Sequence, residues 1–409
     1  MKKILVLIAM LALMGRAAAA DTLVLSFHHY ATDNLFQMKS AVSDQISQVD
    51  LSWDKSLNSF SLFANADYSY LRQSSGLSDF RLSGGTDYLL TLGQKTGLYF
   101  SLEGGAALFR SEYEDFNHSA VRAIVALKTY LTPTSILKIN ATTEYRNYHL
   151  SLFDFVSQSL FASLDKYFET RTTLKADFGW GYKYFLHPII VYDTSSASTS
   201  TSLAAAASTV GSGASGLAGV QSGPGPRWGG QSGRGSMFAS TSSQSAPGLG
   251  IQIASISGIA AQGIGDSIGL RFAGTRQWRL SGGSPYTSVE EYYMVDNPTY
   301  DQFSWTGYAL SGQLTAEMPW NVELKVGYTM AEKEFPGIES RALDGTALGT
   351  SRQDRRRQID LRIEKNFSRL TVFLAYSRIK NASNDPLFDW GGSSLSGGLS
   401  WNHFFGASK

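Results

Sequence analysis

The chain has 409 residues, with 35 basic and 34 acidic side chains, a net charge of +1 and no cysteine. The near balance of charge gives no reason to expect a nucleic-acid partner or a polybasic membrane-surface protein. The lack of cysteine excludes a disulfide scaffold, a cysteine-ligated metal site, a cysteine nucleophile and a lipid anchor. Plentiful aromatic residues, with 40 glycines beside only 10 prolines, are typical of many β-strands rather than long helices.

Residues 1–20 have the pattern of a secretory signal peptide. Lys2 and Lys3 form a basic start, an apolar stretch follows, and the small residues Ala18-Ala19-Ala20 stand directly before Asp21. The apolar stretch is roughly half the ~20 residues that a spanning helix needs, so we expect cleavage between Ala20 and Asp21 rather than a helical anchor. After Asp21 there is no run of ~18 apolar residues, so the mature chain has no candidate transmembrane helix.

Beyond the signal peptide, apolar and polar residues alternate with a period of two. In the last segment Leu395, Leu399 and Trp401 alternate with serines, glycine and Asn402, which separates an apolar face from a polar one. This pattern predicts strands with one face in lipid and one in a polar lumen. Sixteen segments follow it, at 22–31, 40–53, 59–71, 79–92, 98–110, 119–131, 136–148, 156–168, 171–186, 249–263, 267–280, 301–318, 321–334, 352–366, 369–380 and 391–405.

The lengths of the connections distinguish a membrane barrel from a soluble β-sandwich, which also alternates. Every second connection is short, at 54–58, 93–97, 132–135, 169–170, 265–266, 319–320 and 366–368. Those between them are longer, including 281–300, 335–351, 381–390 and about 187–248. Short periplasmic turns and long external loops are typical of outer-membrane barrels. We therefore predict an all-β fold, a transmembrane antiparallel up-and-down barrel of about sixteen strands over 21–409, with both termini periplasmic.

Aromatic residues near the predicted strand ends are candidates for the girdles that membrane barrels place at the lipid interfaces, with ordinary β-propensity as the alternative explanation. They are Trp53, Tyr70, Tyr99, Tyr130, Tyr145, Tyr184, Trp278, Trp305, Trp320 and Tyr376.

The C-terminal hairpin resembles that of bacterial outer-membrane barrels of the porin type. It runs from Gln358-Ile359-Asp360-Leu361-Arg362 through Asn384-Asp385-Pro386 to Ser396-Gly397-Gly398-Leu399-Ser400-Trp401. The last strand is similar to the signal read by the barrel-insertion machinery, with Ser396, Gly398, Trp401 and Phe405 as the nearest equivalents, although His403 and residues 406–409 depart from it. The resemblance covers the architecture and implies the outer membrane of Gram-negative bacteria, with outer-membrane lipid and the barrel-assembly machinery as partners.

Residues 194–247 form a low-complexity segment rich in serine, glycine, alanine and threonine, in which Arg227 and Arg234 are the charges. Such a segment lacks the apolar surface needed to order itself. We predict a flexible extracellular loop at about 187–248, with a lumen plug or an adhesive tip as alternatives, and Pro224 to Gly230 as a candidate ligand contact. The strand that follows, at 249–263, alternates least regularly and could hold a bulge.

The search for catalytic chemistry finds no convincing motif, so we expect no enzyme, cofactor or metal site. His149 and Ser151 have the His-x-Ser spacing of one class of membrane lipid deacylase, which would put both side chains on one strand face. Three residues match by chance too often to carry weight. Glu290, Glu291 and Asp296 fit no calcium-loop pattern.

The charged residues of the polar strand faces are candidates to line a pore. They are Arg81, Asp87, Glu103, Arg122, Lys128, Lys138, Glu144, Arg146, Lys175, Asp177, Arg271, Glu317, Glu323, Lys325, Asp360, Arg362 and Glu364. Both signs are present, which predicts weak ion selectivity if the pore is open. The expected function is a porin-like channel for small solutes. The alternatives are a structural barrel, either a sheath around a periplasmic or lumenal protein partner or a surface adhesin, and last a barrel-embedded lipid hydrolase.

Overall fold

The structure is a computed structural model that describes residues 21–149, 151, 154–187, 250–282, 303–344 and 346–405. The predicted signal peptide and nearly all of the predicted extracellular loop at 187–248 lie outside the described residues, as do Glu290, Glu291 and Asp296. None of the described residues belongs to a helix that is long and apolar enough to cross a membrane.

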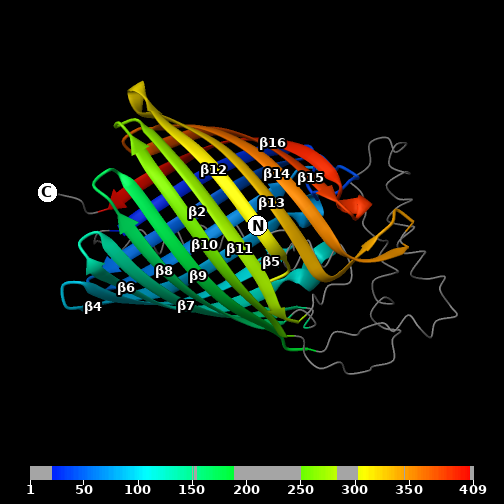
Figure 1. Ribbon diagram of the computed structural model, residues 1–409, viewed down its shortest axis with the longest axis horizontal. Helices are drawn as coiled ribbons and strands as arrows, with labels where there is room; N and C mark the ends of the chain where they lie inside the picture. The colour runs from blue at the N-terminus through cyan, green and yellow to red at the C-terminus, as the bar shows by residue number, and fades with distance from the viewer. Residues whose placement is uncertain are drawn as a thin grey trace.

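The described residues form sixteen antiparallel strands, each paired with its sequence neighbours, and β1 pairs with β16 to close the barrel (Figure 1). Closure leaves no unpaired strand edge, which lipid could not satisfy. The strands are β1 (Asp21–Thr32), β2 (Asp44–Leu57), β3 (Phe60–Leu71), β4 (Asp79–Leu92), β5 (Thr96–Phe109), β6 (His118–Thr132), β7 (Ser135–Tyr148), β8 (Phe155–Tyr167), β9 (Thr172–Phe185), β10 (Gly250–Ile264), β11 (Ile268–Ser281), β12 (Thr306–Met318), β13 (Val322–Arg341), β14 (Ala347–Asn366), β15 (Leu370–Ser383) and β16 (Trp390–Phe405).

This architecture confirms the predicted fold and the predicted strand count. The least regular segment is also a strand, because β10 pairs along its length with β9 and β11. Its register with β11 shifts between Gln252 and Ile253, but the extra residue there is Leu280 of β11, and β10 pairs with β9 without a shift. Ile251 and Ile253 then face the interior of the barrel, whereas Ile256 faces outward.

The two ends of the barrel differ in their connections. At one end, here called the turn end, the strands join through residues 58–59, 93–95, 133–134, 168–171, 265–267, 319–321 and 367–369. Residues in left-handed conformation allow these tight reversals, among them Asn58 at φ 57° and Gly93 at φ 71°. At the other end, the loop end, the connections are longer and include residues 33–43, 72–78 and 110–117. Both ends of the described chain lie at the turn end.

The hairpin of β13 and β14 corrects one predicted connection. The sequence predicted a long loop at 335–351, but β13 continues to Arg341 and β14 begins at Ala347. Pro336 and Gly337 interrupt the alternation, yet pairing resumes after register shifts between Phe335, Glu339 and Arg341. Phe335 and Ser340 are fully buried in this extension, so packing at the loop end holds strand structure that the local pattern does not predict.

The two faces of the wall differ as the alternation predicts. On β5, Leu98, Phe100 and Leu102 face outward, and exposed apolar side chains such as Phe27, Leu160, Phe178 and Ile363 occupy the same outward face around the barrel. Three residues predicted for the aromatic girdles are placed elsewhere: Tyr130 lies on the inward face of β6, with the Nζ of Lys128 5.1 Å from its ring centre, and Tyr99 and Trp305 also leave the lipid face. Tyr99 faces the interior, where its hydroxyl donates to Asp87 at 2.7 Å, and Trp305 is buried in the loop-end packing.

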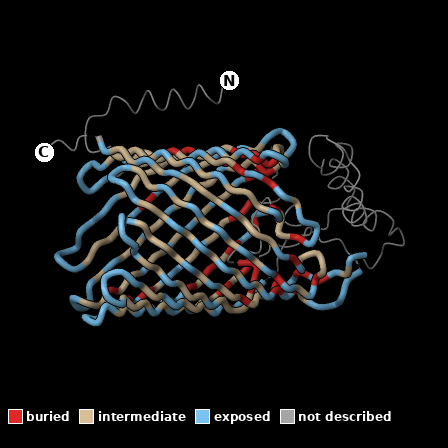
Figure 2. The backbone as a smooth tube through the Cα atoms, turned by 90° about the horizontal axis from the view of Figure 1, so that it is seen from above, coloured by how far each residue is buried: buried red, intermediate tan, exposed pale blue. Residues whose placement is uncertain are grey.

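An apolar cluster fills part of the loop end, where Figure 2 shows the buried residues gathered. Inward-facing Ile46, Leu71, Phe155 and Phe185 meet residues of the connections, such as Leu77. Phe116, Phe303, Trp305 and Phe335 belong to the same cluster. The connections therefore pack against the inner side of the wall and anchor the loop end by apolar burial.

Candidate functional site: the barrel interior

The inward face of the wall carries the residues that the sequence singled out. Strand register places on this face Arg81, Asp87, Glu103, Arg122, Lys128, Lys138, Glu144, Arg146, Lys175, Asp177, Arg271, Glu317, Glu323, Lys325, Asp360, Arg362 and Glu364. Each alternates along its strand with outward-facing residues, so the wall separates charge from apolar surface.

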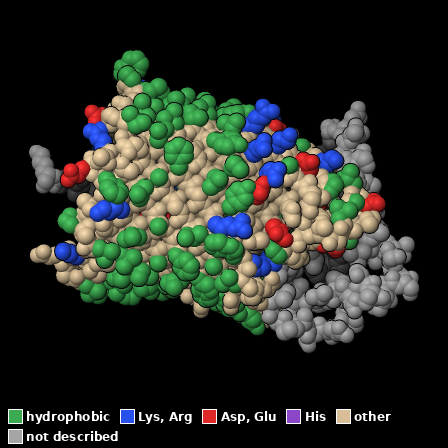
Figure 3. All heavy atoms as spheres, viewed as in Figure 1, with side chains coloured by type: hydrophobic (Ala, Val, Ile, Leu, Met, Phe, Trp, Pro, Cys, Tyr) green, Lys and Arg blue, Asp and Glu red, His purple; other side chains and the backbone are tan. Residues whose placement is uncertain are grey.

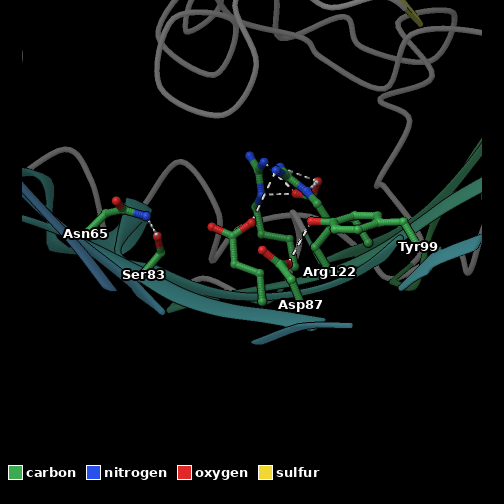
Figure 4. Close-up of polar contacts among 8 residues, drawn as sticks. Asn65, Ser83, Asp87, Tyr99 and Arg122 are labelled. Atoms are coloured by element: carbon green, nitrogen blue, oxygen red, sulfur yellow. Dashed lines mark hydrogen bonds and ion pairs between the residues drawn. The ribbon is translucent and has the colours of Figure 1, made fainter. Parts of the chain in front are cut away.

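A chain of ion pairs crosses β5, β6 and β7 on this face. Glu103, Arg122 and Glu144 lie opposite one another in register, and Arg122 contacts Glu103 at 3.6 Å and Glu144 at 3.0 Å. Glu144 also accepts from Arg146 at 2.7 Å. Figure 4 shows Asp87, Tyr99 and Arg122 rising from the same side of the sheet. Opposite charges on facing positions of neighbouring strands attract, so the register itself assembles the chain of pairs.

Further ion pairs join the predicted residues around the barrel. Lys138 contacts Asp165 on β8 at 2.5 Å, and Lys175 contacts Asp177 at 3.0 Å. On the other side Arg362 contacts Glu364 at 2.7 Å, and Lys325 pairs with Glu323. Within the described part of the chain, Arg271 and Glu317 form no ion pair. Most of these basic groups remain a third or more exposed, so each pair contributes about 0–1 kcal/mol to stability.

Acidic and basic side chains are segregated to different strands around the inward face of the wall, and the sequence alone does not reveal this segregation. Among the described residues facing inward on β2 to β5, the acids are Asp44, Asp50, Asp54, Asp67, Asp79, Asp87 and Glu103, and the one strong base is Arg81. Those facing inward on β6 to β11 include Arg122, Lys128, Lys138, Arg146, Lys175, Lys183, Arg271 and Arg279 against Glu144, Asp165 and Asp177. An acidic wall thus adjoins a basic wall.

A cavity of about 930 Å³ lies inside the barrel between β1–β4 and β14–β16. Gln48, Asp67, Asp79 and Arg81 line it from one side, and Arg356, Gln358, Asp360 and Arg362 line it from the other. Gln48 donates to Asp50 at 2.8 Å and to Asp67 at 2.6 Å, which joins two carboxylates on facing positions. The cavity has the size of a small-molecule site and presents both signs of charge.

Several of these cavity residues escaped the sequence analysis, although a signal for them was present. Arg356 and Gln358 occupy the same alternating positions of β14 as Asp360 and Arg362. Asp67 likewise alternates with Tyr68 in the polar half of β3. That these residues meet around one cavity depends on closure of β1 against β16, which brings both ends of the chain together.

Two buried cations at the loop end form a different environment. Arg352 is 1% exposed, its guanidinium lies 3.5 Å from the centre of the Phe388 ring and 4.5 Å from that of Phe335, and it pairs with buried Asp354 at 2.5 Å. Lys183 is 2% exposed and lies 4.2 Å from the centre of the Phe155 ring. Aromatic faces stabilise both cations away from water. Nearby, burial raises the pKa of Asp385, which accepts hydrogen bonds from the backbone of Leu387 and Arg341.

The catalytic and ligand-binding candidates of the sequence lie outside the strands or outside the described residues. β7 ends at Tyr148, so His149 and Ser151 lie beyond the strand and do not share a strand face; that part of the deacylase hypothesis is wrong. No group of three or more histidine, aspartate or glutamate side chains suited to a metal occurs in the described ranges. The patch from Pro224 to Gly230 lies outside them.

The closed sheet, apolar outside and charged inside, defines the class as an all-β barrel of the membrane-spanning kind. No protein-family model matches the chain, and no curated protein matches it in sequence. The chain is similar to OpdO of Pseudomonas aeruginosa, at 9% identity over 94% of this chain and 97% of that one, with a TM-score of 0.46. The chain is also similar to OccAB1 of Acinetobacter baumannii, at 9% identity over 94% of this chain and 96% of that one, with a TM-score of 0.46. A third similar structure is a bacterial polysaccharide outer membrane secretin, at 8% identity over 93% of this chain and 98% of that one, with a TM-score of 0.48. At these levels the likeness does not extend to what each protein carries or binds.

Proposed function

We propose that the protein is a porin-like channel of the bacterial outer membrane that passes small polar solutes. The observation that carries the proposal is the reversal of polarity across the wall, with exposed apolar side chains outside and a charged, cavity-bearing face inside. A barrel of this size is wide enough for an aqueous path. The turn end would face the periplasm and the loop end the exterior, since outer-membrane barrels have short periplasmic turns.

The arrangement of charge supports a preference for solutes that carry both signs. Asp67 and Asp79 line the cavity opposite Arg356 and Arg362. A cationic group would be stabilised on the first side and an anionic group on the second, so a zwitterion would be oriented as it passes. Simple ions of either sign would meet attraction and repulsion in turn, so we expect weak net ion selectivity.

Conductance through planar bilayers tests the channel, and the chain offers a sharp design because it has no cysteine. Gln358 lines the cavity, and the next residue, Ile359, is 51% exposed on the outward face. A bulky water-soluble thiol reagent should lower the single-channel conductance of Gln358→Cys strongly. The matched control, Ile359→Cys, should conduct as the unmodified protein does.

Two results would contradict the proposal. Folded wild-type protein that gives no stepwise conductance would show that the barrel is not an open channel. Equal effects of the reagent on Gln358→Cys and Ile359→Cys would show that the current does not pass along the inward face. Heat-modifiable migration of each variant on gels would establish that it is folded before the recording.

A further inference from the structure

Near the loop end, the outward face of the barrel differs in charge between β5 and β15. Strands β5 and β15 each have 14 residues and run from the turn end to the loop end. Near the loop end the outward positions of β5 are Gly104 and Ala106. The corresponding positions of β15 are Arg378 and Lys380. Cations therefore occupy outward positions of β15 whose equivalents on β5 are uncharged.

Arg357 on β14 joins these two residues, and the three together are called the basic patch. Arg357 lies directly opposite Lys380 in register, and Arg378 occupies the next outward position of β15. All three side chains are exposed. Figure 3 shows lysine and arginine side chains gathered over β14 and β15 in the half of the barrel nearer the loop end.

Among the described residues, none forms an ion pair or a side-chain hydrogen bond with the basic patch. Neighbouring Arg355 donates to Glu332 at 2.6 Å and so has its own carboxylate. By contrast, the side chains of Arg357, Arg378 and Lys380 make no hydrogen bond or ion pair within the part of the chain that the structure describes. Like charges on facing positions of neighbouring strands repel, and a cation on a lipid-facing wall costs free energy unless an anion meets it.

The surroundings of the basic patch indicate where such an anion is attached. Toward the turn end, the same face continues with the apolar side chains of Ile359, Leu361 and Tyr376, which are suited to acyl chains. Toward β16, Lys380 and Arg378 lie opposite Gly391 and Ser393, whose small side chains leave space for a head group. The head group of a lipid would thus lie against the cations, and its acyl chains would lie against the apolar side chains nearer the turn end.

We propose that the basic patch binds the phosphate groups of an outer-leaflet lipid, a phosphorylated glycolipid with two phosphates. Arginine binds phosphate through parallel N–H donors and lysine binds it as a compact charge, so two arginines and a lysine suit two neighbouring phosphates. This inference rests on the proposed placement of the barrel, with its loop end toward the outer leaflet. The bound lipid would neutralise the patch and fix the depth of this side of the barrel in the membrane.

Lipid binding by the purified full-length barrel in detergent tests the site, with diphosphorylated lipid A as the probe. The test variant carries Arg357→Gln, Arg378→Gln and Lys380→Gln. The control variant carries Lys55→Gln, Lys365→Gln and Arg271→Gln, which removes three positive charges from the turn end and the interior. A basic side chain near an anionic surface contributes roughly fivefold in affinity, so we expect on the order of a hundredfold loss in the test variant and little change in the control.

Other probes distinguish the source of the phosphate. Phosphatidylglycerol, with a single phosphodiester, should bind the wild type more weakly than diphosphorylated lipid A. Inorganic pyrophosphate should not displace bound diphosphorylated lipid A from the wild type. Equal binding by the test and control variants, equal binding of lipid A without phosphates, or displacement by pyrophosphate would each overturn the proposal. The single variants Arg378→Gln and Lys380→Gln, each expected to weaken binding about fivefold, keep it testable if the triple variant does not fold.

Conductance of the same variants separates this inference from the proposed function. The patch faces away from the interior, so the test variant should conduct as the wild type does. A wild type that binds the lipid but does not conduct would contradict the channel alone. A wild type that conducts but shows no preference for the phosphorylated lipid would contradict the patch alone.

Discussion

The inner wall at β5–β7 and the packed loop end use the same chemistry, an arginine beside a carboxylate, in opposite environments. Arg122 has a side chain that is 43% exposed and contacts Glu103 and Glu144. Arg352 has a side chain that is 2% exposed and contacts Asp354, with two aromatic rings completing its surroundings. Water can replace the partner of Arg122, but it cannot reach Arg352. The comparison shows that the wall pairs shape the field of the interior, whereas the loop-end pair holds the structure.

The largest expected effect breaks the buried pair. Asp354→Asn removes the carboxylate that is paired with the Arg352 guanidinium in a site where the arginine side chain is 2% exposed. Breaking a buried ion pair by removing one partner costs about 3–5 kcal/mol, so the free energy of unfolding should fall by that amount. Reversible unfolding in detergent micelles measures it. A loss below about 1 kcal/mol would show that Arg352 is as well solvated as Arg122.

Replacing both partners of the buried pair sharpens the same comparison. The double variant Arg352→Met, Asp354→Leu removes both charges and keeps much of the apolar volume against Phe335 and Phe388. Apolar replacements of a buried pair are often neutral or stabilising by about 1–4 kcal/mol, so we expect most of the loss in Asp354→Asn to be recovered. If the double variant is no more stable than Asp354→Asn, the loss in free energy of unfolding comes from packing rather than from the unpaired charge.

A smaller effect on stability, with a clear effect on ion passage, is expected at the exposed pairs. Arg122→Gln removes the cation between Glu103 and Glu144, and the free energy of unfolding should change by about 0–1 kcal/mol. The interior loses a positive charge and keeps both carboxylates, so the reversal potential in a salt gradient should move toward cation selectivity. Ile359→Gln, on the outward face, serves as a control that should leave the reversal potential unchanged.

The smallest expected effect is a pH dependence at Asp385, beside the buried pair. Burial raises the pKa of this carboxyl in the folded protein above that of the unfolded chain, so folding favours the protonated form. Its contribution to stability is full below the ordinary aspartate pKa and is lost as pH rises through the folded pKa. Relative to the wild type, Asp385→Asn should flatten the pH profile of the free energy of unfolding across that acidic window. Identical profiles would show that Asp385 has the same pKa in both states.

Much of the inward face could be predicted because its signal is local. Asp360 and Arg362 alternate with apolar residues along one strand, and the period of two assigns them to one face without knowledge of the fold. The sequence predicts Tyr99 and Trp305 at the lipid interface because they lie near strand ends. Nearness to a strand end does not indicate which face of the wall a side chain occupies. Tyr99 faces inward by strand register, and Trp305 is buried by contacts with residues distant in sequence.

The sequence by itself determined the all-β class, the sixteen strands, the tight turns and the alternation of two faces, because each depends on residues within a few positions of one another. Only the tertiary structure decided that the acids of β2–β5 share a cavity with the arginines of β14 and that Arg352 is buried. It also decided that Arg357, Arg378 and Lys380 meet on the outer wall with no ion pair among the described residues. Each of these depends on closure of the sheet or on packing at the loop end. Closure and packing join residues far apart in the chain, and a local pattern cannot specify them.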